Sequence, residues 1–188
     1  YTMNPSPATR RRAVLFDRDG TLIVEKHYLH DPAEVVLEAG AIEALTRLRD
    51  LGFVFAVVTN QAGVGRGYYG LDAVAACNAR LADLLAAHGI DVAGWYVCPP
   101  APDEVCDCRK PSPGLALAAA AELDLDLAAS WVVGDKKSDV GLAEAVGARG
   151  ILVTTGHGGT DVAWAEAHGL PVVADLAAAA ALIAEATP

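Results

Sequence analysis

Two aspartates that directly follow a short apolar segment are the residues with the clearest chemical potential. Residues 13–16 are apolar, and residues 17–21 read Asp-Arg-Asp-Gly-Thr. Residues two apart on an extended chain share a face, so the carboxylates of Asp17 and Asp19 can approach one point. Close carboxylates repel each other, and a hard dication such as Mg²⁺ would hold them together. The pattern favours a nucleophilic aspartate beside a general acid and base over a turn with two solvated side chains.

Polar and cationic side chains follow two further apolar segments. Thr59 and Asn60 offer a hydroxyl and an amide to a phosphoryl oxygen, although such a pair is also a common helix cap. The glycine-rich loop at 63–67 carries one cation, Arg66. Arg109 and Lys110 lie beside prolines in an acidic chain and could neutralise a phosphate. Each of these signals is weak alone.

Two more aspartates end a fourth apolar segment. Asp135 and Asp139 follow residues 130–133 and could complete a metal shell, although acidic residues are also common in the first turn of a helix. Open α/β sheets bind ligands outside the carboxyl ends of their strands. The polar clusters that follow the apolar segments therefore predict a single site.

Three of the four cysteines, Cys98, Cys106 and Cys108, lie within eleven positions. In a cytosolic chain such a cluster is more often a metal site than a disulfide framework. The spacing therefore indicates a candidate metal site in this loop.

Apolar and helical segments alternate along the chain, which predicts an α/β fold with a doubly wound, mostly parallel sheet. Strands are expected at 13–16, 53–58, 95–97, 130–133, 150–153 and 171–173. Helices are expected at 41–51, 71–88, 114–122, 138–146 and 175–185, with Ser138 capping the fourth. His157 is expected in a loop. Residues 1–12 are expected to be a disordered lead-in and residues 13–188 a single domain.

Charge and hydropathy exclude several partners. The chain has 188 residues with 24 acidic and 14 basic side chains, a formal net charge of −10. Such a chain has no bulk electrostatic reason to bind nucleic acid or an anionic membrane. The longest apolar stretch near the C-terminus, 176–184, is far shorter than the roughly 20 residues that a bilayer needs. The apolar segment after the arginines at 10–12 is broken at Asp17, so a cytoplasmic protein without a secretory signal is expected.

Read in order, these patterns resemble the four motifs of the haloacid dehalogenase superfamily of phosphohydrolases. The runs at 16–21, 59–61, 65–67, 106–111 and 134–136 look most like the branch that contains heptose bisphosphate and histidinol-phosphate phosphatases. The resemblance spans most of the chain. It implies a capless, Mg²⁺-dependent, cytoplasmic enzyme that is a monomer. Many members of this branch carry a structural zinc. It also implies a small-molecule phosphate ester substrate, with the C7 phosphate of D-glycero-D-manno-heptose 1,7-bisphosphate favoured.

The resemblance implies catalytic roles by position. Asp17 would attack phosphorus and form an aspartyl-phosphate, and Asp19 would protonate the leaving oxygen and then deprotonate the hydrolytic water. Thr59 and Lys110 would hold the transferring phosphoryl group, as phosphoryl transfer requires positioning and charge neutralisation. Arg109 would contribute to substrate recognition.

The resemblance also implies the metal and substrate contacts. Mg²⁺ would be bound by Asp17, the backbone carbonyl of Asp19 and Asp135, with Lys136 nearby. Zinc would be bound by Cys98, Cys106 and Cys108. The remaining substrate-side residues would be Glu25, Lys26, His27, Tyr28, Asn60, Gln61, Ala62 and Arg66.

The sequence departs from its relatives in two places. Their cysteine loop begins Cys-x-His, whereas here Cys98 precedes two prolines and the loop is shorter. A fourth zinc ligand would have to be Asp103, Glu104 or a water, and cysteines that bind no metal are the alternative. His27 and Ala62 stand where relatives tend to have glycine and serine, which leaves the substrate open.

Three alternative functions share part of the pattern. A histidinol-phosphate phosphatase would need an anionic pocket for an ammonium and an imidazole. A DNA 3′-phosphatase would need a basic track, which the net charge of −10 argues against. A receiver-type signalling module also phosphorylates an aspartate but lacks the general acid that Asp19 supplies. Repeated phosphate release from a small aryl phosphate separates an enzyme from such a module.

Overall fold

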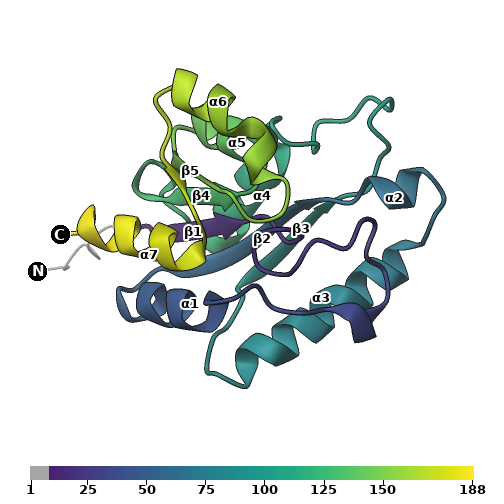
Figure 1. Ribbon diagram of the computed structural model, residues 1–188, viewed down its shortest axis with the longest axis horizontal. Helices are drawn as coiled ribbons and strands as arrows, with labels where there is room; N and C mark the ends of the chain where they lie inside the picture. The colour runs from purple at the N-terminus through teal and green to yellow at the C-terminus, as the bar shows by residue number, and fades with distance from the viewer. Residues whose placement is uncertain (1–8) are drawn as a thin grey trace, which may run out of the picture.

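A six-stranded parallel sheet forms the centre of the protein in the computed structural model, which describes residues 9–188 (Figure 1). The strand order is β3-β2-β1-β4-β5-β6, and each pair of neighbouring strands is parallel. The strands are β1 (Ala13–Phe16), β2 (Val54–Asn60), β3 (Gly94–Cys98), β4 (Trp131–Gly134), β5 (Arg149–Val153) and β6 (Val172–Val173). The predicted α/β fold with a doubly wound sheet is confirmed.

Helices cover both faces of this sheet (Figure 1). One face carries α1 (Ala41–Asp50), α3 (Leu71–Ala86) and α7 (Leu176–Glu185). The other carries α4 (Gly114–Leu123), α5 (Lys137–Val146) and α6 (Gly158–Ala167). The short helix α2 (Ala62–Gly65) follows β2, and two 3₁₀ turns, η1 (Pro32–Glu34) and η2 (Leu127–Ala129), complete the described elements.

The first strand shows why the sequence forms a buried sheet. Its side chains alternate, so Val14 and Phe16 pack toward α1, α3 and α7, while Ala13 and Leu15 pack toward α4 and α5. A strand that is buried on both faces reads as a continuous apolar run. Polar side chains are therefore displaced to the strand's carboxyl end, where Asp17 follows directly.

Two helix predictions were wrong. The N-cap of α5 is Lys136 rather than Ser138, and the Lys136 backbone N–H donates to the Asp139 carboxylate at 3.0 Å. Helix α6 was missed because it begins with two glycines, which are poor helix formers. His157 stands at the N-cap position of α6.

The predicted disordered lead-in differs from the structure at its end. The Arg11 backbone N–H donates to the Asp124 carbonyl at 2.9 Å, and Arg12 donates to the Leu51 carbonyl at 2.7 Å. These bonds fix residues 11 and 12 against the domain, whereas residues 1–8 lie outside the described range. Within residues 9–188, no helix is long and apolar enough to cross a membrane.

Candidate active site

A polar pocket of about 470 Å³ opens at the carboxyl edge of the sheet. The predicted site residues that line it are Asp17, Asp19, Glu25, His27, Tyr28, Asn60, Gln61, Ala62, Arg109, Lys110 and Lys136. Residues that were not predicted to contact substrate also line it: Leu29, Tyr69, Ser138, Asp139 and His157. The strand ends thus bring together segments that are far apart in the sequence, as expected for this fold.

Asp17 lies at the bottom of the pocket and is 6% exposed. Its backbone N–H donates to the Val133 carbonyl at 3.0 Å, which continues the pairing of β1 with β4. Its Oδ1 lies 2.8 Å from Lys110 Nζ. Burial acts to raise the pKa of Asp17, but the charges of Lys110 and Lys136 outweigh burial and hold the pKa below its usual range. The carboxylate is therefore ionised, as a nucleophile must be.

Lys110 is a buried cation with three oxygen neighbours. Its Nζ donates to Asp17 Oδ1 at 2.8 Å and to the Val58 carbonyl at 2.6 Å, and Asp139 Oδ1 lies 2.7 Å away. Burial acts to lower the pKa of Lys110, but the charges of Asp139 and Asp17 raise it above its ordinary value. Two of the ammonium donors are thus used in hydrogen bonds, and the ion pair with Asp139 adds charge compensation, so Lys110 first serves to orient Asp17. Its predicted contact with the phosphoryl group stays a prediction.

Asn60 fixes the backbone beside this cation. Asn60 Oδ1 accepts from the Lys110 backbone N–H at 3.1 Å, and Asn60 Nδ2 donates to the Lys110 carbonyl at 3.4 Å. Both ends of the amide are therefore directed at one residue. The positioning of Lys110 explains a polar side chain here better than a helix cap does.

Three buried carboxylates form a group that a dication fits. Oxygen atoms of Asp17, Asp135 and Asp139 lie within 4.8 Å of one another. Asp135 Oδ2 accepts from the His157 backbone N–H at 2.7 Å, whereas Asp135 Oδ1 is buried without a hydrogen-bond partner among the described residues. Burial, and then the charge of Asp17, raise the pKa of Asp135 to about 8. A magnesium ion would satisfy the free oxygen and relieve this repulsion.

Two glycines make room for the Asp135 carboxylate. A Cβ at Gly20 would come within 2.4 Å of Asp135 Oδ2, and a Cβ at Gly156 would come within 2.3 Å. Both glycines have positive φ, 81° and 53°. The loops after β1 and β5 therefore need glycine to enclose this carboxylate.

Asp139 lies in the same group, but each of its oxygens faces a partner of its own. One oxygen faces Lys110, and the other accepts from the Lys136 backbone N–H. Burial raises the pKa of Asp139 to about 6 against the opposing charge of Lys110. These contacts make Asp139 a support for Lys110, and Asp17 and Asp135 are the carboxylates that fit Mg²⁺. The Asp19 carbonyl stays a predicted ligand.

Thr59 and Asp19 are joined through Gln61. Thr59 is 1% exposed, and its Oγ1 accepts from Gln61 Nε2 at 2.9 Å. The same amide nitrogen donates to Asp19 Oδ2 at 2.9 Å. Thr59 thus keeps its own hydroxyl proton to donate, as the predicted phosphoryl contact would require.

The substrate side of the pocket carries an unusual turn. His27 and Tyr28 have positive φ angles of 49° and 58°, a conformation that costs a non-glycine residue energy. Glu25 Oε1 accepts from the His27 backbone N–H at 2.7 Å, and Glu25 Oε2 lies 3.6 Å from His157 Nε2. A glycine would adopt this left-handed backbone at lower cost than His27 does.

Of three cationic residues that were predicted to contact substrate, one lines the pocket and two do not. Lys26 and Arg66 are exposed and are not among the residues that line the pocket. Arg109 lines it, and its guanidinium also donates to the Pro100 carbonyl. The structure therefore supports the predicted location of Arg109 but not those of Lys26 and Arg66.

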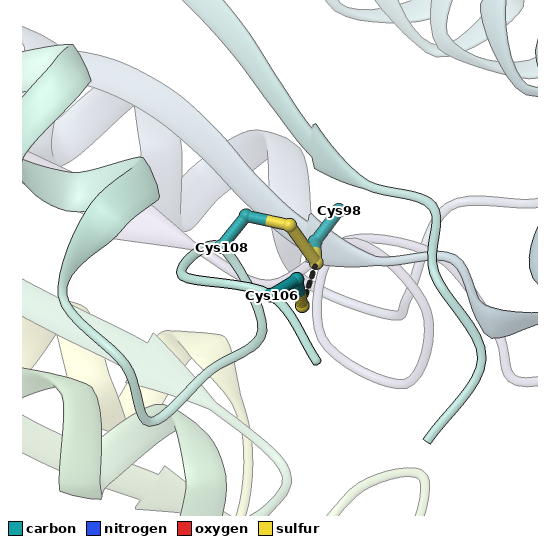
Figure 2. Close-up of side chains that lie close together, drawn as sticks. All are labelled: Cys98, Cys106 and Cys108. Atoms are coloured by element: carbon teal, nitrogen blue, oxygen red, sulfur yellow. Dashed lines mark hydrogen bonds between the residues drawn. A yellow bond between two sulfur atoms is a disulfide. The ribbon is translucent and has the colours of Figure 1, made fainter. Parts of the chain in front are cut away.

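The three clustered cysteines converge on one point (Figure 2). Cys98 ends β3, and its sulfur forms a disulfide with Cys108 and lies 3.6 Å from the sulfur of Cys106. Within the described residues, the group of side chains here that could bind a metal consists of the three cysteines and contains neither Asp103 nor Glu104. Glu104 instead accepts from the Ala101 backbone N–H. Three thiolates and a water would fit zinc once the disulfide is reduced.

Comparisons with known proteins agree with this site. A family model described as HAD-hydrolase-like matches residues 107–179. D-glycero-beta-D-manno-heptose-1,7-bisphosphate 7-phosphatase of Pseudomonas putida is 42% identical over 148 residues, 78% of this chain and 85% of the relative. The Pseudomonas aeruginosa enzyme of the same name is 37% identical over 174 residues, 92% of this chain and 98% of the relative.

A solved structure extends the agreement to three dimensions. D,D-heptose 1,7-bisphosphate phosphatase from B. bronchiseptica, complexed with magnesium and phosphate, matches with a TM-score of 0.85 at 32% identity. The match covers 93% of this chain and 98% of that one. The fold and the overall sequence are thus those of one group of phosphatases. The chain belongs to the HAD-like hydrolases, in the family of the D-glycero-D-manno-heptose-1,7-bisphosphate 7-phosphatases.

Proposed function

We propose that this phosphatase removes the C7 phosphate of D-glycero-D-manno-heptose 1,7-bisphosphate, and that the β anomer is its preferred substrate. The relatives named above act, by their names, on that heptose bisphosphate, and two of them on the β form. The observation that carries the chemistry is the ionised Asp17, which is paired with Lys110 at the bottom of the pocket and followed two residues later by Asp19. A phosphoryl acceptor and a proton donor are thereby available in one pocket.

The reaction proceeds in two steps. A carboxylate oxygen of Asp17 attacks phosphorus, the bond from phosphorus to the sugar oxygen breaks, and Asp19 gives that oxygen a proton. Water then attacks the aspartyl-phosphate while Asp19 takes a proton from it, which releases phosphate, restores the Asp17 carboxylate and returns Asp19 to its protonated form. Mg²⁺, held by Asp17 and Asp135, would neutralise charge on the phosphoryl oxygens. The ester and one water thus become alcohol and phosphate.

The pocket suits a small sugar with two phosphate groups. Its volume of about 470 Å³ lies in the range of small-molecule sites. Arg109 and Lys136 line it and can meet phosphate, while Glu25, His27 and Tyr28 offer the sugar side polar and aromatic surfaces. The single domain over residues 13–188, the monomeric state and the cytoplasmic location stay predictions.

The assay that tests this function measures phosphate release in Mg²⁺ from three esters. These are the two anomers of the heptose bisphosphate and histidinol phosphate, with p-nitrophenyl phosphate as a general substrate for the site. We expect kcat/KM for the β anomer to exceed that for histidinol phosphate by about 100-fold or more, because the latter leaves the second phosphate's contacts unused. Equal and poor rates on both natural esters, with normal release from p-nitrophenyl phosphate, would contradict the heptose assignment.

We further propose that the reduced protein binds one zinc ion through Cys98, Cys106 and Cys108. The convergence of their sulfurs within 4.8 Å supports this, and the loop continues directly into Arg109 and Lys110. A zinc ion would therefore stabilise the segment that carries two of the predicted catalytic residues.

Zinc content is the direct measurement. Protein purified under reducing conditions should carry about one equivalent of zinc and lose thermal stability in a strong chelator. Cys106→Ser should abolish binding, whereas Cys77→Ala, which alters a buried cysteine of α3 outside the cluster, should retain it. Reduced protein that contains no zinc and keeps its stability in chelator would show that the cysteines bind no metal.

A further inference from the structure

Arg18, the residue between the two catalytic aspartates, is completely buried. Its exposed fraction is 0%, and a buried guanidinium must be paired because desolvation of a charge is costly. Arg18 Nε donates to Asp19 Oδ2 at 3.0 Å, and Arg18 Nη2 donates to Asp19 Oδ1 at 3.2 Å. The planar fork therefore fixes the plane of the Asp19 carboxyl group.

Helix α3 fixes the guanidinium in turn. Asn78, which is 7% exposed, accepts from Arg18 Nη1 at 2.9 Å through its Oδ1. This contact joins residues that are 60 positions apart. Asn78 belongs to the packing face of α3, between Val74 and Leu81, and does not line the pocket. An amide on a helix below the pocket thus determines where the Arg18 fork points.

A second contact chain reaches the same carboxyl group from the pocket wall. The Tyr69 hydroxyl donates to Gln61 Oε1 at 3.1 Å, and Gln61 Nε2 donates to Asp19 Oδ2 at 2.9 Å. Burial raises the pKa of Tyr69 to about 12, so the hydroxyl keeps its proton and can act as a donor. Because Tyr69 requires an acceptor, it fixes which end of the Gln61 amide faces Asp19.

The two oxygens of Asp19 are consequently unequal. Oδ2 accepts from both Arg18 Nε and Gln61 Nε2, which fills its two lone-pair positions. Oδ1 accepts only from Arg18 Nη2 within the described chain and keeps one position free. The catalytic proton can therefore occupy Oδ1 without breaking any of the three bonds.

We infer that Asn78 and Tyr69 are positioning residues for the general acid: through Arg18 and Gln61 they orient Asp19 so that Oδ1 carries the proton to the leaving oxygen. The inference rests on the proposed role of Asp19 and extends it to two residues outside the motifs. In the first step the proton moves from Oδ1 to the sugar oxygen as the bond to phosphorus breaks. In the second step the same atom accepts a proton from water.

Two esters with different leaving groups test this role. The p-nitrophenolate leaves without a proton, whereas the alkoxide of 2-glycerol phosphate needs one, so only the second ester depends on the acid. The value of kcat/KM covers every event up to departure of the leaving group. It therefore reports on the step in which the acid acts and leaves out the later hydrolysis of the aspartyl-phosphate. Asn78→Leu should lower kcat/KM for 2-glycerol phosphate about 10-fold or more and change that for p-nitrophenyl phosphate less than about twofold. Tyr69→Phe, which removes only the hydroxyl, should show the same split at about threefold.

Two further variants separate positioning from simple structural damage. Cys77→Ala alters the buried residue next to Asn78 on α3. This variant should change kcat/KM for both esters equally or not at all. Asp19→Asn should show the largest split. Equal losses on both esters in Asn78→Leu and Tyr69→Phe, with a split retained in Asp19→Asn, would overturn the inference and leave the proposed function standing. Loss of the split in Asp19→Asn itself would instead contradict the general acid. Neither result depends on the heptose substrate.

Discussion

Replacement of Asp17 by asparagine is expected to lower phosphate release at least about 1,000-fold, because an amide cannot form the aspartyl-phosphate. The substitution keeps the volume of the side chain. Lys110 keeps Asp139 and the Val58 carbonyl as partners, so the thermal unfolding temperature should change little. Steady-state assays with p-nitrophenyl phosphate in Mg²⁺ measure the first effect, and circular dichroism on heating measures the second.

The mass of the trapped protein provides the control for this variant. Wild-type protein quenched in acid during turnover should carry a phosphate on the peptide that contains Asp17, and the asparagine variant should carry none. The same spectrum detects deamidation, which would regenerate aspartate and mimic residual activity. Activity within about tenfold of wild type, in protein whose asparagine is intact, would assign the nucleophile to another residue.

The site was predictable where its residues follow local patterns. Asp17 and Asp135 stand at the ends of apolar segments, and a buried parallel strand must expel a charged side chain at its carboxyl end. In a parallel sheet the carboxyl ends of the strands lie at one edge, so these aspartates come together regardless of the length of the loops between the strands. The predicted strand segments and the convergence of both aspartates at one edge of the sheet therefore agreed with the structure.

The contacts that support these residues could not be read from local patterns. Arg18 and Asn78 are 60 positions apart, and nothing in an alanine-rich helix indicates that one asparagine meets a buried guanidinium. Tyr69 is separated from Gln61 by a helix of one turn that the sequence did not predict. A charged residue between two catalytic aspartates was the one available signal, since a charge beside a buried strand needs a partner.

The two exposed cations illustrate where a carried-over role needs the structure. The resemblance implied substrate contacts for Lys26 and Arg66. Both are exposed, and neither is among the residues that line the pocket. The direction of a loop side chain depends on the backbone angles of the loop, and residue type alone does not determine these angles.

Replacement of Lys110 by methionine is expected to cost both activity and stability. Methionine keeps the length of the side chain but leaves the carboxylates of Asp17 and Asp139 buried without their cation. Removal of one partner from a buried ion pair typically costs about 3–5 kcal/mol of unfolding free energy. Turnover should fall about 1,000-fold, because Asp17 loses the charge that orients it and keeps it ionised.

The pH dependence of this stability loss identifies its cause. Without Lys110 the folded-state pKa values of Asp17 and Asp139 rise, and that of Asp139 is already about 6 in its presence. A carboxyl group with a raised folded-state pKa binds protons more tightly when folded, so its penalty is absent at low pH and grows as the pH rises through that pKa. Urea unfolding without Mg²⁺ should therefore show a larger deficit at pH 8 than at pH 5.

Lys136→Met is the matched control for this substitution. Lys136 also lines the pocket but is only partly buried, and it makes none of the three contacts that hold Lys110. Its loss should weaken turnover with little change in unfolding free energy, because no buried carboxylate is left without its partner. If Lys110→Met were as stable as wild type at pH 8, the two carboxylates could not both be buried and ionised. The charge balance that makes Asp17 a nucleophile would then need another source.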